Sequence, residues 1–154
     1  MIKYFGMDVH RINHALKVYG FAGTICREEK LKESEIFSSE LAAILHDIGI
    51  PEAERKYNSF AGKYQEMEGP SIARSIMEKL PIDPEIIDRV CYMIGNHHSY
   101  NKIDGQDFQI LVEADFLVNI FEDKMDQRMI ESIRKKNFRT TAGIFILNML
   151  YSLS

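Results

Sequence analysis

Two acidic side chains and two histidines lie in segments that are otherwise apolar. His46 and Asp47 interrupt the run LAAILHDIGI, Asp115 lies in ILVEADFLVNI, and His14 is bracketed by apolar residues in INHALKV. A helix that is apolar all round is expected to be buried, and a buried carboxylate is costly unless it is paired or binds a metal. Imidazole and carboxylate together are ligands for divalent metals. The pattern therefore indicates either a metal site or buried salt bridges to Lys or Arg.

Helices must position these residues, because no segment shows the sustained alternation of apolar and polar residues that indicates a strand. Helix breakers are sparse, with 9 Gly and 4 Pro in the chain. We predict an all-α fold, with a turn-rich loop between residues 99 and 107. The expected helices span approximately 8–29, 34–50, 51–58, 64–80, 84–98, 107–123, 126–136 and 140–152.

Length and composition fit a single globular domain. The chain has 154 residues, of which 45% are hydrophobic and 27% charged, and that is enough to form a core without disulfides. We expect residues 1–154 to form one domain, with 124–154 as C-terminal helices packed on it. Cys26 and Cys91 show no CxxC spacing, so a reducing cytoplasm is the expected location.

The charge balance excludes two classes of partner. The chain carries 19 basic and 23 acidic residues, a formal net charge of −4. Nucleic acids and anionic membranes both require a basic face, so neither is expected as a partner. The longest apolar stretch, near residues 144–153, is also too short to span a bilayer. A small phosphorylated ligand remains possible, because it needs only one local cationic pocket.

The order of these residues resembles the HD domain superfamily of metal-dependent phosphohydrolases. The strings that carry the resemblance are RINHALKVYGFA, ELAAILHDIGI, EGPSIARSI, IGNHHSY and VEADFLVNIFED, and together they cover roughly residues 8–123. The resemblance implies an all-α HD-domain bundle whose helices converge on one divalent metal ion, with Mn, Fe, Co, Ni, Zn and Mg all compatible. The implied ligands are His14, His46, Asp47 and Asp115.

One position departs from the family pattern. Dinuclear members have a further histidine in a string like HxxxGA, and the matching region here reads QEMEGP, with Gln65 at the histidine position. A neutral amide is a poor replacement for an imidazole ligand. His97 or His98 matches a later histidine position of the family, so half of a second site is expected to be retained. We expect one metal ion, or a second one bound only weakly.

The resemblance implies hydrolysis of a phosphate ester, on a nucleotide or another small metabolite. Asp47 is expected to be both a ligand and the group that orients or deprotonates the attacking water. Arg11 lies three residues before His14, on the same face, and is a candidate phosphate clamp. Lys63 is a candidate second cation. The alternatives are an Arg11 paired with an acidic neighbour and a solvated Lys63.

His97 and His98 are further substrate-binding candidates, which would bind phosphate or donate a proton to the leaving group. The alternative is a favourable interaction with the C-terminus of the helix that they are expected to end. Two other functions remain open for the whole chain. The first alternative is a regulatory HD module that binds metal or nucleotide without turnover. The second is a structural helical protein. The apolar tail GIFILNMLYSL closes the core of a monomer or forms a homodimer contact.

Overall fold

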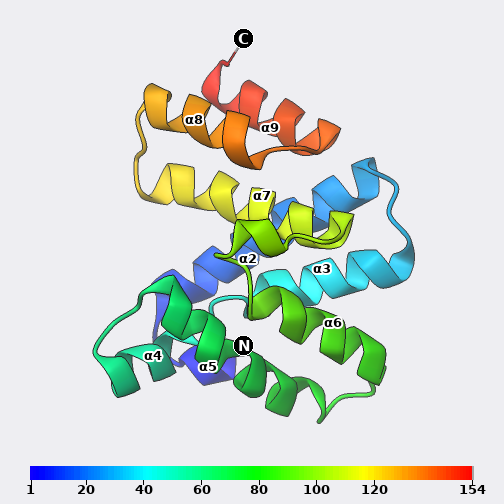
Figure 1. Cartoon of the computed structure of the whole chain (residues 1–154), viewed down its shortest axis with the longest axis vertical. Coiled ribbons are helices and arrows are strands. Elements are labelled where there is room, and N and C mark those ends of the chain that lie inside the picture. The colour runs from blue at the N-terminus through cyan, green and yellow to red at the C-terminus, as the bar shows by residue number, and fades with distance from the viewer. Residues whose placement is uncertain (154) are drawn as a thin grey trace.

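The computed structural model describes residues 1–153, and it contains helices and no strand in that range (Figure 1). The predicted all-α fold is confirmed. None of the helices in this range is long and apolar enough to cross a membrane. The elements are α1 Ile2–Phe5, α2 Val9–Glu28, α3 Glu33–Leu45, α4 Ile50–Tyr57, α5 Gly62–Met77, α6 Pro84–Ile94, the short 3-10 helix η1 Tyr100–Lys102, α7 Gln106–Glu122, α8 Gln127–Asn137 and α9 Thr141–Tyr151.

Helices α2, α3 and α7 pack against one another and form the centre of the molecule (Figure 1). Their facing residues include Val18 and Ile25 of α2, Ala42 of α3 and Leu111 of α7, all without solvent exposure. Each buried aliphatic side chain of valine size or larger contributes about 1.5–3 kcal/mol relative to exposure. Helices α4 to α6 pack at one end of this centre, and α8 and α9 lie at the other (Figure 1). The centre thus holds the helices from which the candidate ligands come.

Side-chain caps set several helix starts. Asp8 accepts a hydrogen bond from the backbone N–H of Arg11 at 3.1 Å, at the start of α2. Side-chain caps also begin α6, α8 and α9, at Asp83, Asp126 and Thr140. Such a cap satisfies backbone donors that have no partner inside the helix. These starts depend on residues within one turn, which is why sequence alone places them well.

The helix predicted over 84–98 is too long, because α6 ends at Ile94 and residues 95–98 form turns. Two side chains donate hydrogen bonds to backbone carbonyl groups near the end of α6. Asn96 Nδ2 donates to the carbonyl of Tyr92 at 2.8 Å, and His97 Nδ1 donates to that of Ile94 at 2.7 Å. Such local bonds compete with helix continuation. His97 and His98 therefore leave the helix and lie in a turn.

The helix predicted over 34–50 also ends early, at Leu45, and the HD pair lies in the turn that follows. This turn packs closely on α5. A Cβ atom on Gly49 would lie 2.5 Å from the carbonyl oxygen of Gln65 and 2.7 Å from the backbone nitrogen of Gly69. Only glycine permits that approach without displacement. The start of α5 at Gly62 places Lys63 in its first turn, whereas we predicted a loop there.

Candidate metal centre

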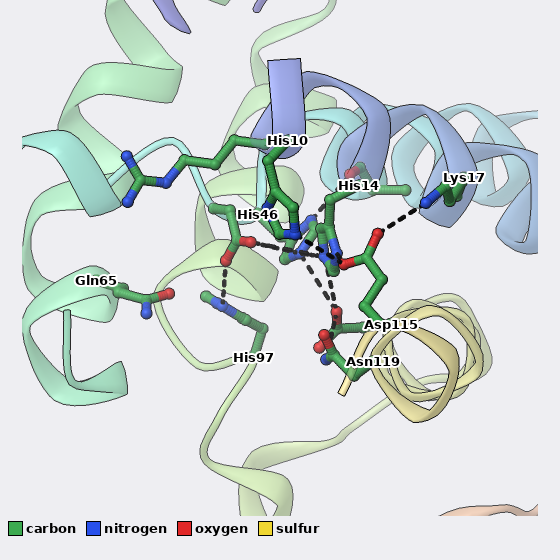
Figure 2. Close-up of polar contacts among 12 residues, drawn as sticks. His10, His14, Lys17, His46, Gln65, His97, Asp115 and Asn119 are labelled. Atoms are coloured by element: carbon green, nitrogen blue, oxygen red, sulfur yellow. Dashed lines mark hydrogen bonds and ion pairs between the residues drawn. The ribbon is translucent and has the colours of Figure 1, made fainter. Parts of the chain in front are cut away.

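Four side chains converge between the central helices (Figure 2). His14 comes from α2, His46 and Asp47 from the turn after α3, and Asp115 from α7. His14 Nε2 lies 3.1 Å from Asp115 Oδ1 and 3.3 Å from His46 Nε2. Asp47 Oδ2 lies 3.4 Å from His46 Nε2 and 3.6 Å from His14 Nε2, and Asp115 Oδ1 lies 3.5 Å from His46 Nε2. The structure brings together the four residues that the sequence predicted as ligands.

These separations fit the edges of a coordination polyhedron. Ligand atoms bound to one ion at about 2.1 Å stand about 3.0–3.4 Å apart in octahedral or tetrahedral geometry. The five separations given above lie between 3.1 and 3.6 Å, and His14, His46 and Asp47 offer ligand atoms close enough together to share one ion, with Asp115 beside the two histidines. The position of the HD pair beyond the end of α3 also answers a geometric difficulty, since adjacent residues inside a helix point about 100° apart. Because His46 and Asp47 lie in a turn, their side chains can face one point.

Three histidines turn Nε2 toward the site, where that of His14 lies within hydrogen-bond distance of Asp115 Oδ1. In each, Nδ1 donates to an oxygen behind the ring, and this fixes the tautomer that a metal ligand at Nε2 requires. The acceptors are the Ala43 carbonyl for His46 at 2.9 Å, a Glu122 carboxylate oxygen for His14 at 2.9 Å and the Ile94 carbonyl for His97 at 2.7 Å. The rings are therefore oriented for coordination before any ion binds.

His97 Nε2 is buried and has no hydrogen-bond partner among the described residues. It points toward Asp47 Oδ1, 3.7 Å away (Figure 2). Unpaired buried polar atoms are rare and usually indicate a water or ion. Asp47, His97 and His98 also offer ligand atoms close enough to share an ion. Asp47 therefore lies between two groups of imidazoles, one facing each of its oxygens.

Gln65 is buried and its amide is fully engaged. Its Nε2 donates to the carbonyl of Phe60 at 2.6 Å, and its Oε1 accepts from His98 Nε2 at 3.1 Å. A Cβ atom on Gly62 would lie 2.5 Å from the His98 ring, so this glycine makes room for the imidazole. Gln65 thus orients His98.

The carboxylates and imidazoles shift one another's pKa values. Burial lowers the pKa of His14, but the hydrogen bond to Asp115 and the neighbouring carboxylates outweigh it, and the pKa is raised. The pKa of His46 is likewise raised well above its usual value against the effect of burial, chiefly by Asp47. Burial opposes ionisation of Asp47, yet His46 holds its pKa well below the usual range.

Arg11 lines a cavity of about 300 Å³ that also reaches His14 and Asp47. Its guanidinium pairs with Asp8 at 2.9 Å and with Glu54 at 2.7 Å. The acidic pairing that we considered as the alternative for Arg11 is therefore present, and the side chain still faces the cavity.

Lys63 is exposed, and its ammonium lies 4.6 Å from the ring centroid of Tyr64. It is not among the residues that line the cavity beside His14 and Asp47. Its position favours the alternative of a solvated lysine, although it now belongs to a helix and not to a loop.

Two supporting residues escaped the sequence analysis. Glu122 binds His14 Nδ1 through one oxygen and Lys17 Nζ through the other, at 2.9 Å each. Asn119 Nδ2 donates to Asp115 Oδ1 at 2.9 Å. Both follow Asp115 on α7, at four and seven residues, so they share its face. The sequence shows that spacing. It does not show the residues that Glu122 contacts on α2.

Comparisons with known proteins agree with this geometry. A family model described as HD domain matches residues 11–135. The crystal structure of a predicted HD superfamily hydrolase from an uncultured Thermotogales bacterium superposes with a TM-score of 0.70 at 22% sequence identity, covering 97% of this chain and 80% of that one. At that identity the likeness shows the fold alone. No curated protein sequence gives a significant match.

Proposed function

Because this chain belongs to the HD domain family, a family of metal-dependent hydrolases, we propose that it hydrolyses phosphate esters of nucleotides or other small metabolites. The observation that carries the proposal is the buried, unpaired Nε2 of His97 beside Asp47. It adjoins a set of nitrogen and oxygen atoms spaced as metal ligands. His97 Nε2 lies 3.7 Å from Asp47 Oδ1, beyond hydrogen-bond length, so this ion pair leaves the buried nitrogen without a hydrogen bond.

His14, His46, Asp47 and Asp115 would hold the divalent ion. Such an ion supplies Lewis acidity toward a phosphoryl oxygen and lowers the pKa of a bound water. The Oδ1 atom of Asp47 faces away from His14 and His46, so it is the oxygen available to orient the attacking water and to accept its proton. His97 and His98 lie beside that oxygen and would bind the phosphate or protonate the leaving group.

The charges of the cavity favour substrates with few phosphates. Arg11 is the one Lys or Arg among the described residues that line it, whereas Glu54, Glu122 and Asp123 also face it. Arg11 retains N–H groups beyond those that bind Asp8 and Glu54, because a guanidinium has five donors. We therefore propose that Arg11 binds a single phosphate and that monophosphates are preferred over triphosphates.

A substrate screen tests the function. Nucleoside mono-, di- and triphosphates, cyclic nucleotides and sugar phosphates would each be incubated with Mn, Fe, Co, Ni, Zn or Mg, and phosphate release measured. We expect metal-dependent release that is strongest with monophosphates. Asp115→Ala should lose both metal and activity while keeping its helical circular dichroism. Full metal retention in this variant would contradict the assigned site. Arg11→Ala should weaken substrate binding with the metal retained, and unchanged kinetics would show that Arg11 is not part of the site.

A regulatory HD module is the second candidate, favoured by Gln65. Its amide is engaged with Phe60 and His98, so it is not available to complete a second metal site. The same screen separates the two functions. Measurable nucleotide binding by calorimetry, with no phosphate release under any metal, would favour regulation over turnover.

A further inference from the structure

Helix α9 is apolar but only partly covered, with Ala142, Ile144, Ile146 and Tyr151 half-buried against the core. It contains no charged residue between Thr141 and Tyr151, and only Gly143 and Leu147 of it are fully buried. Phe145, Met149 and Leu150 are 63%, 68% and 54% exposed. Such a helix normally has most of its circumference buried. Much of the apolar surface of α9 therefore faces solvent at one end of the molecule (Figure 1).

The exposed surface continues beyond α9 onto neighbouring helices. Phe121, at the end of α7, is 69% exposed and lines a cavity of about 310 Å³ together with Leu150. Phe145 lines a second cavity of about 520 Å³ beside Thr24 of α2. Phe145 and Met149 are four residues apart, so they share one side of the helix. We call Phe121, Phe145, Met149 and Leu150 the α9 face.

The size of the α9 face is appropriate for a protein interface. Its four side chains expose roughly 500 Å² of largely apolar surface, at about 200 Å² for each fully exposed side chain. That is near the upper end for the largest apolar patch of a monomer, about 300–600 Å². A standard interface buries roughly 800 Å² per partner, so the α9 face would form the apolar centre of such an interface.

We propose that the α9 face is the interface of a homodimer, in which two α9 helices pack antiparallel across a two-fold axis. In a two-fold contact the same patch faces itself, so a charged patch would repel its own copy. The four side chains of the α9 face carry no charge, and the charges beside them are of both signs, with Lys17 next to Leu150 and Glu28 and Glu29 next to Phe145. The antiparallel arrangement also opposes the two helix dipoles. The neighbouring α8 exposes Arg128, Lys135 and Lys136, so an acidic partner would bind there and not on α9.

Analytical ultracentrifugation of the full chain tests the proposal, from micromolar to near-millimolar concentration. We expect wild type to sediment as a dimer, and Phe145→Glu and Met149→Glu to shift it to monomer. Met67→Glu is the matched control, because Met67 is 62% exposed but lies on α5, and it should remain dimeric. Circular dichroism and metal content should be unchanged in all three variants, since none of these residues touches the metal centre.

Three results would overturn the proposal. They are a wild type that is monomeric at every concentration, a dimer that survives both α9 substitutions, and a control variant that dissociates as readily as they do. If the glutamate variants fail to fold, Met149→Cys with a bifunctional maleimide provides a second test, because the two native cysteines are buried. Cross-linked dimer is then expected, and exclusively monomeric product would contradict the proposed axis. The outcome is independent of catalysis.

Discussion

His14 is held from behind by Glu122, and this pairing is the most specific support that the site receives. One oxygen of Glu122 accepts from His14 Nδ1 and the other from Lys17 Nζ (Figure 2). Burial raises the pKa of Glu122, but the bonds from Lys17 and His14 prevail and lower it. An ionised carboxylate behind a ligating imidazole fixes the ring and increases its basicity.

Replacing Glu122 should weaken metal binding without removing a ligand. We expect Glu122→Ala to lower the affinity for Mn about 10–100-fold, the usual effect of losing such a partner. Glu122→Gln should recover part of the loss, because its amide oxygen can still accept from His14. Competition with a chelator measures the affinity. Glu54→Ala is the control, since Glu54 lines the same cavity but pairs with Arg11; equal affinities in wild type and Glu122→Ala would remove the role of Glu122.

At the scale of the elements, a second buried carboxylate joins α7 to the C-terminal helices. Glu113 of α7 is fully buried. It accepts hydrogen bonds from the backbone nitrogens of Arg139 and Thr140, at 2.6 and 2.9 Å, and from the Thr140 hydroxyl. Thr140 in turn caps α9. Glu113 therefore serves as an anchor for the α8–α9 connection and not as part of the metal centre.

Removing this anchor should destabilise the protein. Glu113→Ala leaves two backbone N–H groups without their acceptor, and we expect a loss of about 2–4 kcal/mol in the free energy of unfolding. Glu113→Gln keeps an acceptor oxygen and should lose less. Urea unfolding followed by circular dichroism gives the values. Glu131→Ala, at an exposed position of α8, should stay within about 0.5 kcal/mol of wild type; a similar loss there would show that the effect is not specific to Glu113.

At the scale of the whole molecule, the metal centre links the three central helices. Its candidate ligands come from α2, from the turn after α3 and from α7, and these helices also build the core. Such a site exists only in the folded chain, so an ion that binds it stabilises the native state by mass action. Metal binding and global stability should therefore be coupled.

Adding Mn should raise the melting temperature, with a stabilisation of about 2.7 kcal/mol at one hundred times the dissociation constant. The gain should shrink as pH falls. Because the pKa values of His14 and His46 are raised in the folded protein, protons occupy these imidazoles up to a higher pH and compete with the ion. Differential scanning fluorimetry across pH measures this. A shift of equal size in Asp115→Ala would contradict binding at this centre.

The sequence by itself determined the helical class, most helix starts and the four candidate ligands. The helix starts depend on short-range signals such as the Asp8 cap. The ligands follow from the family resemblance, supported by the unusual position of Asp115 in an apolar run. Helix ends were less predictable. The end of α6 depends on hydrogen bonds from the side chains of Asn96 and His97 to backbone carbonyl groups.

Only the tertiary structure decided which distant residues meet. Glu122 is 108 positions from His14, and no local pattern links them. From the sequence, Gln65 was interpreted as a missing metal ligand. The structure shows that it orients His98 through a hydrogen bond. Likewise, the sequence of α9 shows that the helix is apolar but not which of its sides packs against the core. Caps and periodicity arise from contacts within a turn or two, whereas the site, its supports and the α9 face arise from long-range packing, which one sequence does not encode in any local pattern.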